Sequence, residues 1–326
     1  MLHPIVASVK ITMTTSPKIY DALIIGSGPA GLSVALGLAR QLYTAVVFDS
    51  QQYRNHPADR MHNVITWDHQ PPEKFRASAR QNISDRYKLI EFRQARVETI
   101  RQLDDGTFEA IDGQQSRTIG KKVVLATGVT DLVPAIEGFS TLWGKSIFHC
   151  LFCHGYEEAG GQSAGIFASG MLTDPNMALH MAGMAASLAK DVVLYANGDA
   201  SVAERMKTAS EGKRVTVEPR KIVAIERKET ERTDVLVHFG DGEAREETFL
   251  VAVPPAEVNG PFVEQLGLEI TEQGFIKTIS PFYATNVPGV FAIGDCATPF
   301  KAVPQAIAMG TFAAGGIAGQ LGQQKL

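Results

Sequence analysis

The segment HCLFCH, from His149 to His154, carries the residues best suited to chemistry. Two cysteines, Cys150 and Cys153, stand two residues apart, and a histidine adjoins each on its outer side. Such a CxxC pair binds zinc, forms a structural disulfide or carries electrons. Thiol–disulfide exchange needs a thiolate and a good leaving group. Imidazole titrates near neutral pH, so His149 and His154 are both candidates for the base that activates a thiol.

Zinc is the rival chemistry for this segment. Zinc usually takes four ligands, and adjacent His–Cys pairs cannot easily aim all four groups at one metal. The third cysteine of the chain, Cys296, is expected to be a small buried residue without a catalytic role. His56, His62 and His69 lack metal-site spacing, and core or surface roles suffice for them. We therefore expect a redox-active CxxC and no metal site.

A glycine-rich turn near the N-terminus indicates which element positions a redox cofactor. The sequence GSGPAG at 26–31 follows an expected strand at 22–25 and opens an expected helix at 30–42, which is the context of a dinucleotide-binding fingerprint. Its first glycine allows the tight turn, its second lets the backbone approach a pyrophosphate, and its third lets the helix pack on the strand. The helix N-terminus then supplies amide donors to the phosphates.

Two acidic residues extend this pattern. Asp49 ends an expected second strand at 45–48, where a carboxylate would accept hydrogen bonds from an adenosine ribose. Gly294 and Asp295 lie at the carboxyl end of an expected strand at 290–293, where ligands of open α/β sheets bind. Asp295 there would bond a ribitol hydroxyl, or else cap the helix expected behind it.

The middle of the chain repeats the α/β pattern with a degenerate turn. A strand is expected at 163–168, a helix at 176–188 and a strand at 191–195. In the turn between the first two, only Gly170 fits a phosphate-binding pattern, and Asp174 near the helix start would repel a pyrophosphate. No arginine follows Tyr195 to accept a 2′-phosphate. A working NADPH site is therefore not expected.

Bulk properties narrow the class further. The 326 residues suffice for two domains, and 44% hydrophobic and 20% charged residues are ordinary for a globular protein. A formal charge of −4 gives no electrostatic footprint for nucleic acid, and no apolar run reaches bilayer length, so neither partner is expected. Residues 1–18 are interpreted as a flexible tail. Three cysteines are too few for a secreted disulfide framework, so a cytoplasmic location is expected.

The order and spacing of GSGPAG, VVLATG, CxxC and VPGVFAIGD resemble those of the thioredoxin reductase-like flavoproteins. The segments HCLFCHGYE, AVVFDSQQYRN, MHNVITWDH and GDCATPFKAV are similar to one branch, the fungal dithiol oxidases that close the disulfide of gliotoxin and related epidithiodioxopiperazines. The resemblance implies two Rossmann-like domains and a homodimer. It places a discontinuous FAD domain at 19–131 and 254–326, with a CxxC domain of degenerate NADPH type inserted at 132–253.

The resemblance also implies the residues that hold FAD. The turn residues would cradle the pyrophosphate, Asp49 the adenosine ribose and Asp295 the ribitol. It implies that Asn63 lies near the isoalloxazine and that the backbone of Val97 contacts the adenine. For both residues the alternative is structural packing. The remaining implied contacts lie in the ATG segment and where a helix N-terminus faces the flavin pyrimidine. The full set is Gly26, Gly28, Ala30, Gly31, Asp49, Asn63, Val97, Thr127, Gly128, Gly294, Asp295, Gln305 and Ala306.

By the same resemblance, Cys153 would pass electrons to FAD and Cys150 would exchange with an incoming dithiol. His154 stands where the family commonly has an acidic residue, so His149 and His154 are comparably plausible as the base. The expected function is oxidation of a small-molecule dithiol, with dioxygen reoxidising the flavin to give hydrogen peroxide. The alternatives are an NADPH-dependent disulfide reductase and a non-catalytic flavoprotein that binds a partner.

Overall fold

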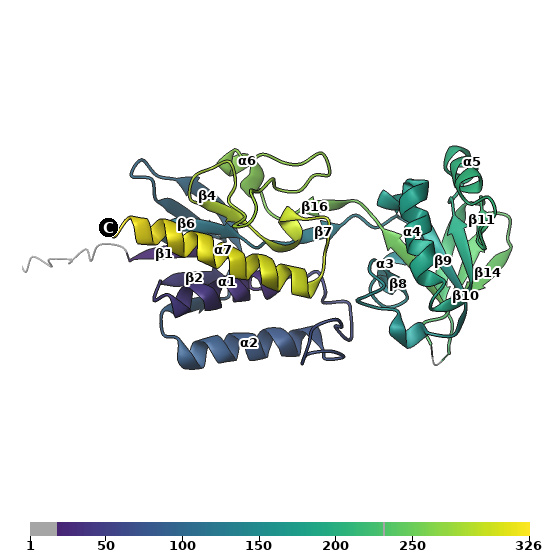
Figure 1. The fold of residues 1–326 in the computed structure, drawn as a ribbon, viewed down its shortest axis with the longest axis horizontal. Coiled ribbons are helices and arrows are strands. Elements are labelled where there is room, and N and C mark those ends of the chain that lie inside the picture. The colour runs from purple at the N-terminus through teal and green to yellow at the C-terminus, as the bar shows by residue number, and fades with distance from the viewer. Residues whose placement is uncertain (1–17, 231) are drawn as a thin grey trace, which may run out of the picture.

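The computed structural model describes residues 18–230 and 232–326, so the expected tail, apart from Lys18, lies outside the described residues. Two α/β units lie next to each other along the long axis (Figure 1). The N-terminal and C-terminal segments together build one unit, and the middle of the chain builds the other. The predicted fold class, a discontinuous Rossmann-like domain with a second one inserted, is confirmed.

The first unit is built on a seven-stranded sheet with the order β3-β2-β1-β6-β5-β4, in which β17 also pairs with β6. Strands β1, β2, β3, β6 and β17 run parallel, whereas β4 and β5 form an antiparallel extension. The elements are β1 (Ile19–Ile25), α1 (Pro29–Arg40), β2 (Ala45–Phe48), α2 (Pro72–Arg86), β3 (Ile90–Arg93), β4 (Val97–Gln102), β5 (Phe108–Asp112), β6 (Arg117–Leu125), α6 (Phe262–Leu266), β17 (Val290–Ala292), the 3-10 turn η3 (Gly294–Ala297) and α7 (Val303–Gln323).

The parallel strands are apolar along their length because both faces of the sheet are covered. Alternate residues, such as Ala22 and Ile24, pack under α1 and α7 in one core. Their neighbours Leu23 and Ile25 pack in a second core, which β4, β5 and α6 complete. The carboxyl ends of β1, β2 and β6 thus meet at one edge, fixed by burial on both sides.

The second unit contains a parallel sheet with the order β11-β10-β9-β15-β8 and an antiparallel sheet with the order β12-β13-β14. Helices α4 and α5 pack on the parallel sheet in a core of their own. The elements are α3 (Phe139–Leu142), β8 (Ile147–Phe148), η1 (Tyr156–Glu158), β9 (Gly161–Gly170), η2 (Met171–Thr173), α4 (Pro175–Ala185), β10 (Ala189–Tyr195), α5 (Ala200–Ala209), β11 (Thr216–Glu218), β12 (Ile222–Arg227), β13 (Val235–Phe239), β14 (Ala244–Glu247) and β15 (Phe249–Val253).

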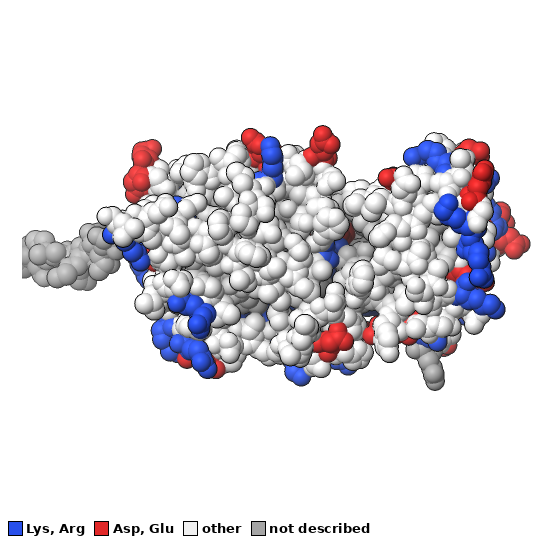
Figure 2. Space-filling view, viewed as in Figure 1, with Lys and Arg blue, Asp and Glu red and all other residues white. Residues whose placement is uncertain are grey.

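A two-stranded ribbon joins the units. It pairs β7 (Val129–Asp131) with β16 (Ala256–Val258). Over the middle of the face in Figure 2 few side chains are charged, and Lys, Arg, Asp and Glu lie mostly along its rim. Among the described helices, none combines the length and apolar character that a membrane span requires. Residues of both units line the site described next.

Candidate active site between the two units

A cavity of about 320 Å³ opens at the carboxyl ends of β1, β2 and β6 and reaches the second unit. Ten of the residues expected to hold a cofactor line it: Gly26, Gly28, Ala30, Asp49, Val97, Thr127, Gly128, Gly294, Asp295 and Ala306. The second unit contributes residues of the HCLFCH segment: His149, Cys153 and His154. The structure thus brings the glycine-rich turn and the CxxC segment to one cavity.

The glycine-rich turn has the shape that a phosphate cradle requires. Gly26 has a φ of +114°, and a Cβ there would lie 2.2 Å from the Ala126 carbonyl oxygen. A Cβ on Gly31 would lie 2.0 Å from the Gly26 carbonyl oxygen, so this glycine sits behind the cavity and sets the helix against the strand. By contrast, a Cβ on Gly28 would meet nothing within 4 Å. Open space therefore lies where a pyrophosphate would approach the start of α1.

Asp49 is buried at the end of β2, where its carboxylate is already engaged within the protein. The Tyr53 hydroxyl donates to both of its oxygens at 2.7 Å, and Arg80 also bonds one of them. Asp49 is 1% exposed, so these partners compensate the burial of its charge. Its expected role toward a ribose stays a prediction, and Tyr53 and Arg80 are partners that the sequence did not reveal.

The CxxC segment follows β8 and makes a single turn rather than a helix. Cys150 and Cys153 are joined in a disulfide, and the amides of Cys153 and His154 donate to the Cys150 carbonyl at 3.2 and 3.0 Å. Gly155, with a φ of +144°, then ends the turn. Of the two cysteines in the disulfide, Cys153 lines the cavity and Cys150 does not. The two cysteines therefore have different access to whatever fills the cavity.

Contacts from the first unit fix the Cys153 end of the turn. Nδ1 of His62 lies 2.7 Å from the Cys153 carbonyl oxygen, so this nitrogen carries the proton and donates. The His154 ring packs edge-on against His62 and stacks on Phe148. No hydrogen bond from the described residues occupies a ring nitrogen of His154. Burial lowers its pKa to about 4, so His154 is neutral at pH 7, with one unprotonated ring nitrogen.

Arg54 joins His149 to two carboxylates. Its guanidinium forms a bidentate pair with Asp131, at 2.8 and 3.0 Å, and lies 3.5 Å from Asp295. Its Nη1 lies 3.2 Å from Nε2 of His149 and donates to it. Burial first, and then the positive charge of Arg54, hold the pKa of His149 well below its usual value. His149 is therefore a neutral acceptor already engaged by Arg54.

Three expectations need comment. Asn63 and Gln305 do not line the cavity; the exposed Asn63 has a left-handed backbone, and its neighbour His62 lines the cavity instead. The helix-cap alternative for Asp295 is wrong, because α7 begins only at Val303 with Ala302 as its N-cap. Cys296 is fully buried, as expected, and burial raises its pKa to about 11.

Helix α4, at whose start a second dinucleotide was expected to be repelled, is capped by an acidic side chain. Asp174 is the N-cap of α4, and its side chain accepts a hydrogen bond from the Asn176 amide at 3.0 Å. Gly170 cannot carry a Cβ, because it would lie 2.3 Å from the Val253 carbonyl oxygen, and Leu172 fills the turn as a buried residue. The amide and the dipole end that would bind a phosphate are thus occupied by a negative group.

Two Rossmann-like units and a disulfide beside the cavity that both units line are the features of a disulfide oxidoreductase. A model of the pyridine nucleotide-disulphide oxidoreductase family matches residues 20–310, and the chain belongs to that family. The prediction that it resembles the thioredoxin reductase-like flavoproteins is confirmed by the relatives and structures described next.

Relatives cover nearly the whole chain. The thioredoxin reductase sirT of Leptosphaeria maculans is 40% identical over 94% of this chain and 95% of its own. The thioredoxin reductase tcpT of Claviceps purpurea is 42% identical over 96% of each chain. The crystal structure of an oxidoreductase from Agrobacterium tumefaciens superposes with a TM-score of 0.81 at 30% identity, covering 93% of this chain and 99% of that one.

The protein is an FAD-binding oxidoreductase, as flavoproteins of this family are. The cavity fits that cofactor in two respects. Gly28 leaves space at the start of α1, and the buried hydroxyl of Thr127 at the cavity wall has no hydrogen-bond partner among the described residues. The half-buried Asp295 beside Arg54 supplies a further polar group at the same wall. The turn, Thr127 and Asp295 are thus the groups that would hold the flavin nucleotide.

The glycine turn yields a prediction with a matched pair of variants. Gly28→Ala adds a methyl group to the cavity and should weaken FAD binding by on the order of tenfold or more, while the apoprotein keeps its melting temperature. Gly31→Ala forces a clash with backbone and should destabilise the apoprotein itself by about 1–3 kcal/mol. Flavin fluorescence titration and thermal melts of the apoproteins measure the two effects. Equal melting temperatures for both variants would contradict this division of roles.

Proposed function

We propose that this protein is an FAD-dependent dithiol oxidase. Its substrate would be a small-molecule dithiol of the epidithiodioxopiperazine kind, in which it forms a disulfide by way of Cys150 and Cys153. The observation that carries the proposal is the asymmetry of the Cys150–Cys153 disulfide, because Cys153 lines the cavity and Cys150 does not. The self-capped start of α4 supports the same reading, since it disfavours NADPH as the electron source.

The exchange needs two thiol groups on the substrate. The first substrate thiolate attacks Cys150 Sγ, which breaks the Cys150–Cys153 bond and releases Cys153 as a thiolate. The second substrate thiolate attacks the substrate sulfur of this mixed disulfide and releases Cys150. The substrate leaves as a disulfide, and the protein has gained two electrons as a dithiol.

When bound, FAD would accept these two electrons from the cysteine pair and pass them to dioxygen, which gives hydrogen peroxide. The side chains manage the two protons that the substrate thiols release. His154 is the better placed acceptor, because its ring nitrogens are free of hydrogen bonds from the described residues, whereas His149 is engaged by Arg54. His149 would instead position the start of the CxxC turn. A homodimeric state, implied by the family resemblance, stays a prediction.

The rival function is an NADPH-dependent disulfide reductase, and it is favoured by the fungal relatives, which are named thioredoxin reductases. Under the proposal, NADPH should reduce the bound flavin only slowly and at high concentration, because the Asp174 carboxylate occupies the start of α4. A panel of small dithiols should reduce it readily, and air should restore the oxidised spectrum. Anaerobic stopped-flow absorbance measures both reactions. Rapid stoichiometric bleaching by NADPH without added thiol would establish the reductase.

The position of the two sulfurs predicts different spectra for two variants. In Cys150→Ser the remaining Cys153 thiolate faces the cavity and should give a broad long-wavelength charge-transfer band with oxidised FAD that titrates with pH. Cys153→Ser should show no such band, because Cys150 does not line the cavity. Both variants should lose dithiol oxidation, since the relay needs two sulfurs. Oxidase activity retained by both variants would refute the electron path.

The hydrogen-bond pattern predicts which histidine is the base. His154→Ala should slow flavin reduction by dithiol about ten- to a thousandfold, as expected for loss of a general base, with FAD content unchanged. His149→Gln, which keeps an acceptor for Arg54, should slow the reaction less. His180→Ala, an exposed histidine on α4, serves as the control. A larger loss in His149→Gln than in His154→Ala would assign the base to His149.

A further inference from the structure

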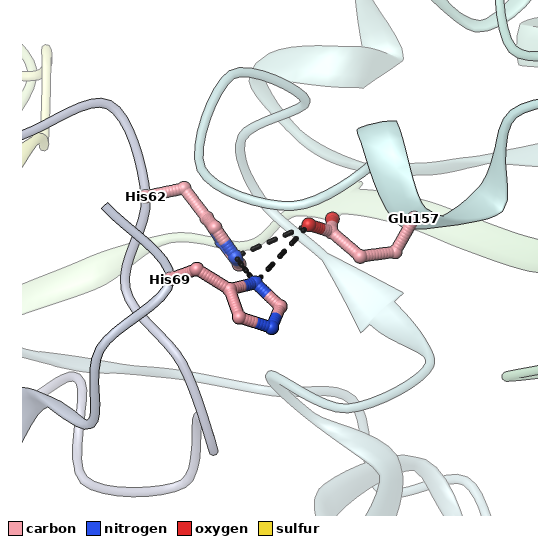
Figure 3. A group of neighbouring side chains, drawn as sticks. All are labelled: His62, His69 and Glu157. Atoms are coloured by element: carbon pink, nitrogen blue, oxygen red, sulfur yellow. Dashed lines mark hydrogen bonds and ion pairs between the residues drawn. The ribbon is translucent and has the colours of Figure 1, made fainter.

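We propose that His62, His69 and Glu157 form a binding site for a first-row divalent metal ion, best suited to zinc, that links the two units. One ligand atom from each residue lies within 4.8 Å of the other two. Figure 3 shows the three side chains pointing toward one another, two from the loop before α2 and one from the turn after the CxxC segment. Sequence spacing alone gives these histidines core or surface roles, because it does not bring Glu157 next to them.

The separations of the ligand atoms match a small coordination shell. Nε2 of His62 lies 3.1 Å from Nδ1 of His69 and 3.2 Å from Oε1 of Glu157. Nδ1 of His69 lies 3.7 Å from the same Glu157 oxygen. A zinc ion about 2.1 Å from each ligand holds tetrahedral neighbours about 3.4 Å apart. The three observed separations lie on either side of that value.

The His62 ring is oriented as a metal ligand would be. Its Nδ1 donates to the Cys153 carbonyl oxygen at 2.7 Å, which turns its Nε2 toward the other two residues. Metal-binding histidines are commonly fixed by this kind of bond from the second ring nitrogen to a backbone carbonyl. The side chain is 12% exposed, which restricts other orientations of the ring.

The loop that carries both histidines is closed by its own backbone. A bridge pairs Met61 with Gln70, and the His69 amide donates to the Met61 carbonyl at 2.9 Å. Asn63, Thr66 and His69 all have positive φ angles, which turn the chain back on itself within a few residues. Residues seven apart in sequence thereby become neighbours, and the ligands are brought together before any ion binds.

A cation would resolve the electrostatics of the group. Nε2 of His62 stands 3.2 Å from the Glu157 carboxylate, so a cation among the three ligand atoms would bond both groups without a proton on that nitrogen. Within residues 18–230 and 232–326, the only ion-pair partners of Glu157 are these two histidines. His69 and Glu157 are 61% and 39% exposed, which leaves the ion a route from solvent. Two imidazoles and a carboxylate suit zinc, with a position left for water.

The site would act on the arrangement of the two units. His62 and His69 belong to the first unit, and Glu157 follows the CxxC turn of the second. An ion bound to all three would hold Cys153 against the cavity, through the turn and through the His62 bond to its carbonyl. The cysteine sulfurs are not ligands, so this site differs from zinc binding by HCLFCH itself.

Isothermal titration calorimetry with zinc chloride tests the site on the tag-free, full-length, FAD-loaded protein. The protein is kept oxidised, so that its CxxC sulfurs stay in the disulfide, and is freed of metal with a chelator. One zinc ion per chain should bind. His69→Ala and Glu157→Gln should each weaken binding by at least about tenfold. His56→Ala and Glu272→Gln, which change exposed residues of the same types, should bind zinc as the wild type does.

Two further measurements separate a built site from incidental binding. X-ray absorption at the zinc edge should show imidazole and oxygen ligands and no sulfur. Zinc should slow amide hydrogen exchange in residues 61–70 and 150–158 of the wild type, and should not do so in Glu157→Gln. Absence of saturable binding to the wild type, or equal binding by all four variants, would overturn the proposal. Neither measurement depends on flavin turnover. A failure of the zinc-site proposal can therefore be told apart from a failure of the dithiol oxidase proposal.

Discussion

The guanidinium of Arg54, whose side chain is only 15% exposed, is the charge on which the arrangement of this site depends. It neutralises Asp131 on the connecting ribbon, lies beside Asp295 at the cavity wall and donates to His149 at the start of the CxxC turn. Removing one partner of a buried ion pair costs about 3–5 kcal/mol, because the other charge is left uncompensated. One cation therefore ties together the ribbon, the expected ribitol position and the segment that carries the disulfide.

This constraint also separates the two histidines of HCLFCH, which look equivalent in the sequence. Arg54 occupies one ring nitrogen of His149, and burial, followed by this positive charge, lowers the pKa of that imidazole. His154 lies beyond that contact, between Phe148 and His62, with its ring nitrogens free of the described donors and acceptors. Arg54, far earlier in the chain, thus engages the ring of His149 and leaves that of His154 free.

The sequence predicted the parts of the fold that local patterns determine. Strand β1, helix α1 and strand β2 were placed within a few residues, because a glycine-rich turn between apolar elements leaves few alternatives. Helix α2 was not predicted, since it is polar on nearly all sides and buries only Pro72, Arg76 and Ile83. At the site, the cysteines and ten cavity-lining residues were identified, but the partners formed by tertiary contact were not: Tyr53, Arg54, His62 and Arg80. Each lies in a loop or a polar helix, where periodicity carries no signal.

The N-termini of α1 and α4, which hold similar places in the two units, differ in charge. Helix α1 begins at Gly28 without a side-chain cap from the described residues, and open space lies in front of it. Helix α4 begins at Asp174, whose carboxylate already accepts the Asn176 amide hydrogen. An anion is stabilised at the first helix start and repelled at the second. A carboxylate at the start of α4 disfavours NADPH as the electron donor. The proposed donor is then a dithiol that reduces the Cys150–Cys153 disulfide, of which Cys153 lines the cavity. A single carboxylate at the cap of α4 is thus the structural feature that supports the proposed oxidase over the reductase.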